Sequence, residues 1–442
     1  MSGSSVHTQV AVSREEAKPV SHDEAARFIV RVGTALHSYG ATAIRLESVL
    51  SELSRFFGMS GVFRSTPSEI IVALQEEAEA AQRVAIVPTA TPDVQLDKLA
   101  RIGELLRELA TERLTLAEAT DRLDEIDRAP PPWGALGMTI GYVAVALGVT
   151  PLIGGSWTDT WVAAAVSIAV FMMVLVSSRL GTVGAALMPF STALVAGVLA
   201  ALAKLWLPDL NLVLVVLAAV AVILPGYSIS LGVGELVTQH VVSGTANLMR
   251  GLVCLVKQVA GGGLGIVFVS SLVILPSGGP SVPIDPDWVA GMFPFFVLGL
   301  CLTFQMAARD FLPATIVSLL AYFAALGGTA LLGAIAGTLV GTIVAVGTVQ
   351  VWAHRTGRPT TILMIPVIVT LISGAIGFRG LAEIWQGDAV LGLRDFTQMF
   401  IVALTVLAGL LIGNGLFQRD DAIARAVKER EHRTASQDKH IE

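Results

Sequence analysis

Charged residues are scarce in this chain of 442 residues, because Asp, Glu, Lys and Arg together make up only 14% of it. An ordinary soluble domain contains about a quarter charged residues. Cysteine is nearly absent, with two in the chain, which excludes a disulfide-bonded scaffold. Apolar residues instead reach 54%, and the mean hydropathy is +0.72. This composition excludes a disordered chain and a typical cytosolic enzyme, and it indicates a membrane protein.

The chain also has no excess of basic residues over acidic ones. The formal net charge of −6 arises in residues 1–130, which contain 14 basic and 20 acidic residues. Residues 131–417 contain only nine of each, and residues 418–442 contain six of each. We therefore predict a polar head, a lipid-soluble body and a charged cytoplasmic tail, with no surface that recruits nucleic acid. Residues 1–21 lack the apolar core of a secretory signal, and we expect them to be disordered.

Residues 22–130 are predicted to form a small cytoplasmic α/β domain. Apolar residues recur at helical spacing on both sides of Gly40, and Gly58 follows as a stop signal. No His/Cys cluster or nucleophile elbow is present. Several polar residues lie near apolar ones, His37, Arg45, Glu47, Thr66 and Glu69, and the lone His37 is interpreted as a surface or satisfied residue rather than a catalyst. We predict two helices within 22–57, strands at 62–64, 69–74 and 83–87, and helices at 93–110 and 115–127, the last opened by a Thr115–Glu118 capping box.

The body consists of apolar segments separated by glycine, proline and sparse charges. A membrane-spanning helix needs about 20 apolar residues. Cys254 and Cys301 lie in such segments without partners at ligand spacing, so we expect free thiols and no metal or other cofactor. We predict ten spans, at 133–150, 160–177, 181–203, 210–226, 251–275, 289–306, 312–326, 329–351, 361–376 and 395–417, as two five-helix halves (131–275 and 289–417) joined by a loop at 276–288.

Basic residues are unevenly distributed between the predicted loops. The bias follows the positive-inside rule and predicts a multi-pass protein of the cell (inner) membrane with both termini in the cytoplasm. The inner loops contain Arg179, Arg250, Arg309, Arg355 and Arg358, and the outer loops contain Lys204, Arg379 and Arg394.

Two short apolar segments, 210–224 and 362–376, end at small-residue breaks, Pro225-Gly226 and Ser373-Gly374. An offset of 148 residues aligns Gly226 with Gly374, Gly232 with Gly380, Glu235 with Glu383 and Gly244 with Gly392. A repeat of five spans inverts its second copy, and inverted repeats with broken helices are typical of secondary transporters. The freed backbone groups must then line a cavity or be buried in protein.

Glu235 and Glu383 are the only glutamates of the body, nine residues past each break. One hypothesis is that they bind a substrate ammonium or carry a proton, since ionisable groups at membrane depth are costly. The alternative places both in interfacial loops. Ser228, close to the first break, either binds a small polar solute or caps backbone groups.

Two further polar groups leave alternatives open. Arg309-Asp310, after Gln305, forms either an internal ion pair or proton relay or, the interpretation we favour, a solvated turn that marks the inner face. Asn247, Arg250, Lys257 and Gln258 share one helical face and form either a polar stripe along the pathway or a stretch at the cytoplasmic surface before a helix that begins near Val259.

These features resemble the threonine/serine exporter family over residues 22–417. The resemblance is carried by Gly33 to Glu47, Ser65-Thr66-Pro67, Leu224-Pro225-Gly226 with Ser243-Gly244, and Arg309-Asp310 with Ala321-Tyr322-Phe323. It implies a cytoplasmic N-terminal domain, ten spans and proton-driven export of L-threonine and L-serine. The chain departs from the family at Ser373-Gly374, where Pro-Gly is expected, and between Tyr227 and Val233.

We therefore expect a secondary transporter, not an enzyme, that exports small neutral amino acids by proton-coupled alternating access. Its partners would be the amino acid, protons and the lipid bilayer, and homo-oligomerisation is left open. No ATP-binding loop is present. The alternatives are a membrane-anchored enzyme or sensor whose chemistry lies in the head, and a structural scaffold.

Overall fold

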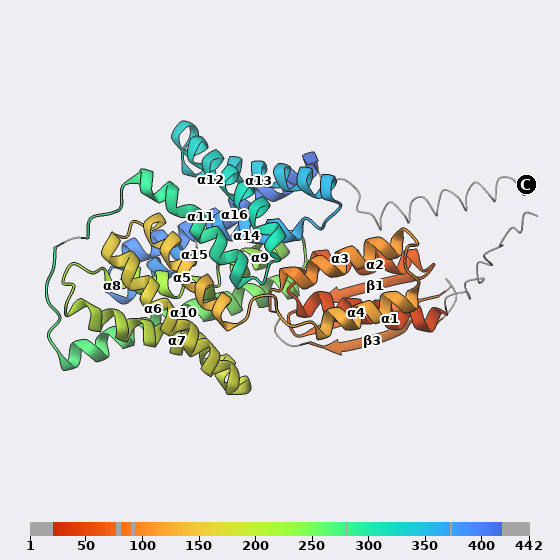
Figure 1. Cartoon of the computed structure of the whole chain (residues 1–442), viewed down its shortest axis with the longest axis horizontal. Coiled ribbons are helices and arrows are strands. Elements are labelled where there is room, and N and C mark those ends of the chain that lie inside the picture. The colour runs from red at the N-terminus through yellow and green to blue at the C-terminus, as the bar shows by residue number, and fades with distance from the viewer. Residues whose placement is uncertain (1–20, 77–80, 90–92, 280, 372–373, 418–442) are drawn as a thin grey trace, which may run out of the picture.

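The computed structural model describes residues 21–76, 81–89, 93–279, 281–371 and 374–417. The head and the helical body lie end to end along the long axis of the molecule (Figure 1). The predictions for the N-terminus up to residue 20 and for the charged tail fall outside the described residues.

The head packs four amphipathic helices with an antiparallel sheet of order β1-β2-β3. Phe28, Leu46 and Ile70 are fully buried between these layers. Gly40 has φ +86°, a conformation that glycine adopts without strain and that turns the chain from α1 to α2. The elements confirm the predicted helices and strands: α1 (His22–Ser38), α2 (Ala43–Phe56), β1 (Ser60–Ser65), β2 (Glu69–Gln75), β3 (Arg83–Pro88), α3 (Leu96–Ala110) and α4 (Leu116–Arg128), with the Thr115–Glu118 capping box in place.

All the secondary-structure elements of the body are helices over the residues that the structure describes. Nine of these helices are long and apolar enough to cross a membrane, and one bent pair makes ten, as predicted. The helices are α5 (Ala135–Leu152), α6 (Trp157–Arg179), α7 (Gly181–Lys204), α8 (Leu212–Ala219), α9 (Gly226–Val237), α10 (Val241–Leu272), α11 (Pro286–Thr303), α12 (Phe311–Leu332), α13 (Ala334–Thr356), α14 (Thr361–Leu371), α15 (Gly374–Trp385) and α16 (Ala389–Phe417).

The predicted break at Pro225-Gly226 is present. The α8 helix and the stretch from Ala221 to Val237 differ in direction by 62°. A 3-10 turn (Ala221–Ile223) ends the part of the span before the break, and α9 begins after the break, at Gly226. The side chain of Gln258 donates a hydrogen bond of 3.0 Å from Nε2 to the Ile223 carbonyl. A carbonyl near the break is thus satisfied by a neighbouring helix, as a low-dielectric environment requires.

Several predicted span boundaries are wrong, and the tenth span, for example, begins at Ala389 and not at 395. The fifth span begins at Val241 and not at 251, because polar residues of its first turns face protein instead of lipid. The seventh span continues to Leu332, and the turn falls at Gly333 (φ +89°) instead of 326–329. Gly328 stays helical since it lies against Gly337 of α13, where a Cβ would come within 2.9 Å of the facing Cα.

Both halves of the body use the same helix pairings. In the first half α6 packs on α7, α7 on α10 and α9 on α10; in the second half α12 packs on α13, α13 on α16 and α15 on α16. Gly232 meets Gly244 backbone to backbone, and Gly380 meets Gly392 in the same way. Close approach at small residues is a usual way to pack membrane helices.

Candidate functional site

Glu235 of α9 is completely buried at the contact between α9 and α10. Its Oε2 accepts hydrogen bonds from Ser243 Oγ (2.8 Å) and from Asn247 Nδ2 (2.7 Å). Arg250 Nη2 donates to Asn247 Oδ1 at 2.6 Å, which extends the chain of polar groups along α10. The Gly232–Gly244 approach brings the two helices close enough for these bonds.

The second oxygen of the Glu235 carboxylate has surroundings different from those of the first. Glu235 Oε1 is buried and accepts no hydrogen bond of normal geometry from the residues that the structure describes. The backbone amide of Ala43, in the first turn of α2, interacts with the same carboxylate. Helix N-termini favour negative charge, so the head contributes to the stabilisation of Glu235. A buried acceptor without a partner is suited to an incoming proton or cationic group.

A cavity of about 700 Å³ opens beside Glu235. This volume lies in the range of small-molecule sites. The broken helix, α7 and α10 form the wall of the cavity on the side of the body. Five predicted site residues line it, Pro225, Ser228, Glu235, Asn247 and Arg250. Further lining residues are Tyr227, Ser243, Cys254 and Lys257. Gln258, which shares their helical face, binds the break instead. The interpretation of this stretch as a surface segment before the helix is therefore wrong.

The head forms the other side of the same cavity, through His37, Thr42, Ser65, Thr66 and Pro67. His37 Nδ1 lies 3.5 Å from Ser65 Oγ. This contribution was not predicted from the sequence, where the lone His37 was interpreted as a surface or satisfied residue. Nothing in the local pattern distinguishes them, since only the docking of the head places them beside the body.

Glu383 does not join this site. It lies on α15, its side chain is 26% exposed, and Arg379 Nε is 3.8 Å from its Oε1. Arg379 in turn binds Asp395 at 2.5 Å. Glu235 and Glu383, which the offset of 148 residues aligns, therefore have different surroundings. Glu235 borders the cavity, and Glu383 belongs to a partly exposed ionic cluster.

Gln305, Arg309 and Asp310 connect the head to the body and do not line the cavity. Gln305, at φ +52°, accepts from the Asp97 amide (3.0 Å) through its carbonyl and from the Trp133 amide (3.0 Å) through Oε1. Arg309 pairs with Glu104 of the head at 2.8 Å. The favoured interpretation of Arg309-Asp310 as a solvated turn is wrong for Asp310, which is buried, whereas the Arg309 side chain is 56% exposed.

Asp310 is 1% exposed and bonds to Arg358, which also contacts Glu104 at 3.2 Å. A four-membered ionic chain thus crosses from the head into the loop between α13 and α14. Desolvation makes such a pair costly to break, since a buried charge would lose its partner.

Gly374 begins α15 directly against Gly226, where a Cβ would lie 3.0 Å from the Gly226 Cα. The start of α15 therefore meets the break of the first half inside the body. Ser373 lies outside the described residues. In the described part of the chain, no group of three or more His, Cys, Asp or Glu side chains is arranged to hold a metal ion.

A helical membrane protein with a polar cavity at a broken helix has the construction of a transporter. A family model described as "Putative threonine/serine exporter" matches residues 27–269, more than half of the chain. The chain belongs to this family, which confirms the resemblance found in the sequence. No solved structure matches the chain.

Relatives occur in bacteria and yeasts. The "Probable threonine/serine exporter" of Mycobacterium tuberculosis is 22% identical over 88% of this chain and 75% of its own length. The "Pheromone-regulated membrane protein 10" of Yarrowia lipolytica is 26% identical over 51% of this chain, and that of Candida albicans is 25% identical over the same share. The match covers only 19% and 21% of these two yeast proteins.

Proposed function

We propose that this protein exports small neutral amino acids, threonine and serine, across the cell (inner) membrane by proton-coupled alternating access. Both termini lie in the cytoplasm. The observation that carries the proposal is the buried Glu235 carboxylate, with one oxygen unused, at the wall of a cavity next to a broken helix.

The polar groups of the cavity are complementary to a hydroxylated zwitterion. Glu235 Oε1 accepts from the ammonium group, and Arg250 binds the carboxylate from the same side of α10. Ser228 and Thr66 offer hydroxyls to the side chain. The exporter named for Mycobacterium tuberculosis supports threonine and serine as substrates.

Glu235 is also the proton carrier in this proposal. Its carboxylate holds either the substrate ammonium or a proton, so that one displaces the other during the cycle. The two states exchange without leaving an unpaired charge in the membrane, where a charge costs roughly 2.5–3.5 kcal/mol on insertion scales.

The repeated helix pairings support alternating access between two inverted halves. The contact of Gly226 with Gly374 supports a pivot between the halves, because the break of the first half meets the start of α15 there. An experimental structure in an outward-facing state tests this directly. Superposition of α5–α10 on α11–α16 by a half-turn is expected, and failure of the halves to superpose would remove the inverted repeat.

Export is tested in cells loaded with a threonine dipeptide, with and without this protein. We expect lower intracellular threonine when the protein is present, and loss of that difference with a protonophore. Equal accumulation in both strains would contradict threonine export.

Glu235→Gln is expected to reduce efflux at least tenfold, because hydrogen bonds to charged groups contribute about 1.5–3 kcal/mol. Glu383→Gln is the matched control, since it changes the other glutamate of the body outside the cavity. If Glu235→Gln exported threonine at the wild-type rate and with the wild-type pH dependence, the carboxylate mechanism would be contradicted.

A further inference from the structure

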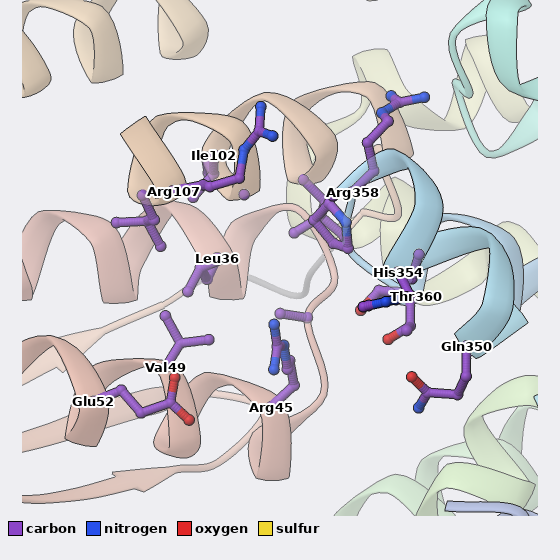
Figure 2. A pocket seen from close by; sticks show the side chains of 18 of the residues that line it. Leu36, Arg45, Val49, Glu52, Ile102, Arg107, Gln350, His354, Arg358 and Thr360 are labelled. Carbon is purple, nitrogen blue, oxygen red and sulfur yellow. The ribbon is translucent and has the colours of Figure 1, made fainter. Parts of the chain in front are cut away.

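A second cavity, of about 480 Å³, lies where the head meets the loop between α13 and α14 (Figure 2). Leu36, Val49 and Ile102 approach it from the head, and His354 and Thr360 approach it from the body. Only Ala41 lines both cavities. The second cavity is therefore separate from the Glu235 site, and its occupant need not be the exported substrate.

Positive charge dominates this second cavity. Four arginines line it, Arg45, Arg107, Arg355 and Arg358, against one acidic residue, Glu52. Asp310 and Glu104 compensate Arg358. Arg107 and Arg355 form no ion pair with any residue that the structure describes. Two guanidinium charges are thus left without an ionic partner among the described residues.

Two buried hydrogen-bond donors also lack acceptors. Arg107 Nε and Arg358 Nη2 are buried, and neither has a hydrogen-bond partner among the described residues. The Arg107 side chain is fixed against Gly357, where a Cβ would come 2.8 Å from Nη1. Buried charged donors without acceptors are unfavourable, which points to an anion that supplies the missing oxygens.

The number of free charges selects the kind of anion. A carboxylate would neutralise only one of the two unpaired arginines, whereas a phosphate monoester carries −1.5 to −2 charges and three acceptor oxygens. Guanidinium groups match phosphate oxygens in a bidentate geometry. The apolar side chains Leu36, Ile102 and Phe417 complete the wall and can cover an organic group.

We propose that this cavity binds the phosphate group of an organic phosphate monoester among Arg107, Arg355 and Arg358, at the contact of head and body. The ester is either a soluble metabolite or the headgroup of a membrane lipid. Because the ligand contacts both parts of the chain, its binding stabilises the docked head.

The test uses the full chain in nanodiscs of phosphatidylcholine, with thermal unfolding followed by tryptophan fluorescence. Glycerol 3-phosphate is titrated in one arm, and phosphatidic acid replaces part of the lipid in the other. We expect a saturable rise of the unfolding midpoint in at least one arm, and the responding arm identifies the source of the phosphate.

Arg107→Gln and the exposed-site variant Arg355→Gln are each expected to weaken the response about tenfold. Arg113→Gln is the matched control, since Arg113 is an exposed head arginine outside the cavity, and it should respond as wild type. If Arg107→Gln does not fold, Arg355→Gln still tests the proposal, because Arg355 is exposed and its replacement should leave folding intact.

Two results would overturn the proposal. The first is the absence of a saturable shift in both arms, and the second is an equal shift in the wild type and Arg355→Gln. Neither of these results bears on threonine efflux, so the export proposal is judged separately.

Discussion

At the scale of single residues, Glu235 owes its position to its neighbours. A buried carboxylate is unfavourable unless donors satisfy it, and Ser243 and Asn247 satisfy one oxygen while the other has no hydrogen-bond partner among the described residues. Asn247 bridges the two charged residues, because its side-chain amide donates a hydrogen bond to Glu235 and accepts one from Arg250. The orientation of both charged groups therefore depends on one neutral side chain.

We predict that Asn247→Ala raises the KM for threonine export about tenfold, since Arg250 loses its fixed orientation and Glu235 loses a donor. Initial efflux rates at several internal threonine concentrations measure this. Asn414→Ala is the control, because Asn414 bonds only weakly to Gln350 at 3.4 Å, away from the cavity. An unchanged KM in Asn247→Ala would show that the polar chain does not hold the substrate.

Tyr39 gives a pH prediction for the head. Burial, followed by the hydrogen bond of 2.5 Å to Asp127, raises the pKa of Tyr39 above its ordinary value near 10. A raised folded-state pKa means that this stabilisation is complete below the unfolded-state pKa and is lost as pH rises through the folded-state pKa.

Tyr39→Phe is therefore expected to unfold at a lower temperature than wild type at pH 7, by the equivalent of about 1 kcal/mol for one hydrogen bond. The difference should narrow above pH 10. Thermal unfolding between pH 7 and pH 11 measures it, and a constant difference over that range would be inconsistent with the raised pKa.

At the scale of elements, the contact of α9 with α10 sets the geometry of the site. A Cβ on Gly232 would lie 2.6 Å from the Leu248 amide nitrogen and 2.8 Å from the Gly244 carbonyl oxygen. Since these are backbone atoms, the helices would have to separate. Glu235 would then move away from Ser243 and Asn247.

We predict that Gly232→Ala destabilises the protein by about 1–3 kcal/mol, the usual cost of overpacking, and lowers export. Gly234→Ala is the matched control on the same helix, where the nearest atom to a Cβ is Leu407 Cδ1 at 3.5 Å. Thermal unfolding of both variants in detergent provides the comparison. Equal midpoints for the two would contradict the close contact.

The sequence allowed the broken helix to be predicted, because proline and glycine interrupt an apolar segment and glutamate is rare in the body. It did not allow the start of α10 to be predicted. Asn247 and Arg250 reduce local hydropathy as a surface turn would, and only tertiary packing shows that they face a cavity. The unequal surroundings of Glu235 and Glu383 were likewise invisible in the repeat.

At the scale of the whole molecule, the head is part of the cavity wall. Backbone bonds from Leu96 to Phe304 (2.9 Å) and from Asp97 to Gln305 (3.0 Å) join it to the body, along with the ionic chain through Glu104 and Arg358. The sequence predicted the elements of the head well, yet its docking could not be read from local patterns. Long-range pairs such as Arg358–Asp310 leave no periodic signal.

Arg358→Gln is expected to destabilise the docked molecule by about 3–5 kcal/mol, because Asp310 would remain buried without its cation. Arg309→Gln should cost at most about 1 kcal/mol, since Arg309 is 56% exposed. Limited proteolysis between head and body, together with thermal unfolding, compares the two. Similar losses in both variants would argue against a buried pair.

The most direct test of the central claim uses the two cysteines. Cys254 lines the Glu235 cavity, whereas Cys301 is fully buried elsewhere. Alkylation by a maleimide, followed by mass spectrometry, should modify Cys254 first. Threonine should slow this reaction in the wild type and not in Glu235→Gln. Alkylation of Cys254 at the same rate with and without saturating threonine would contradict substrate binding in this cavity.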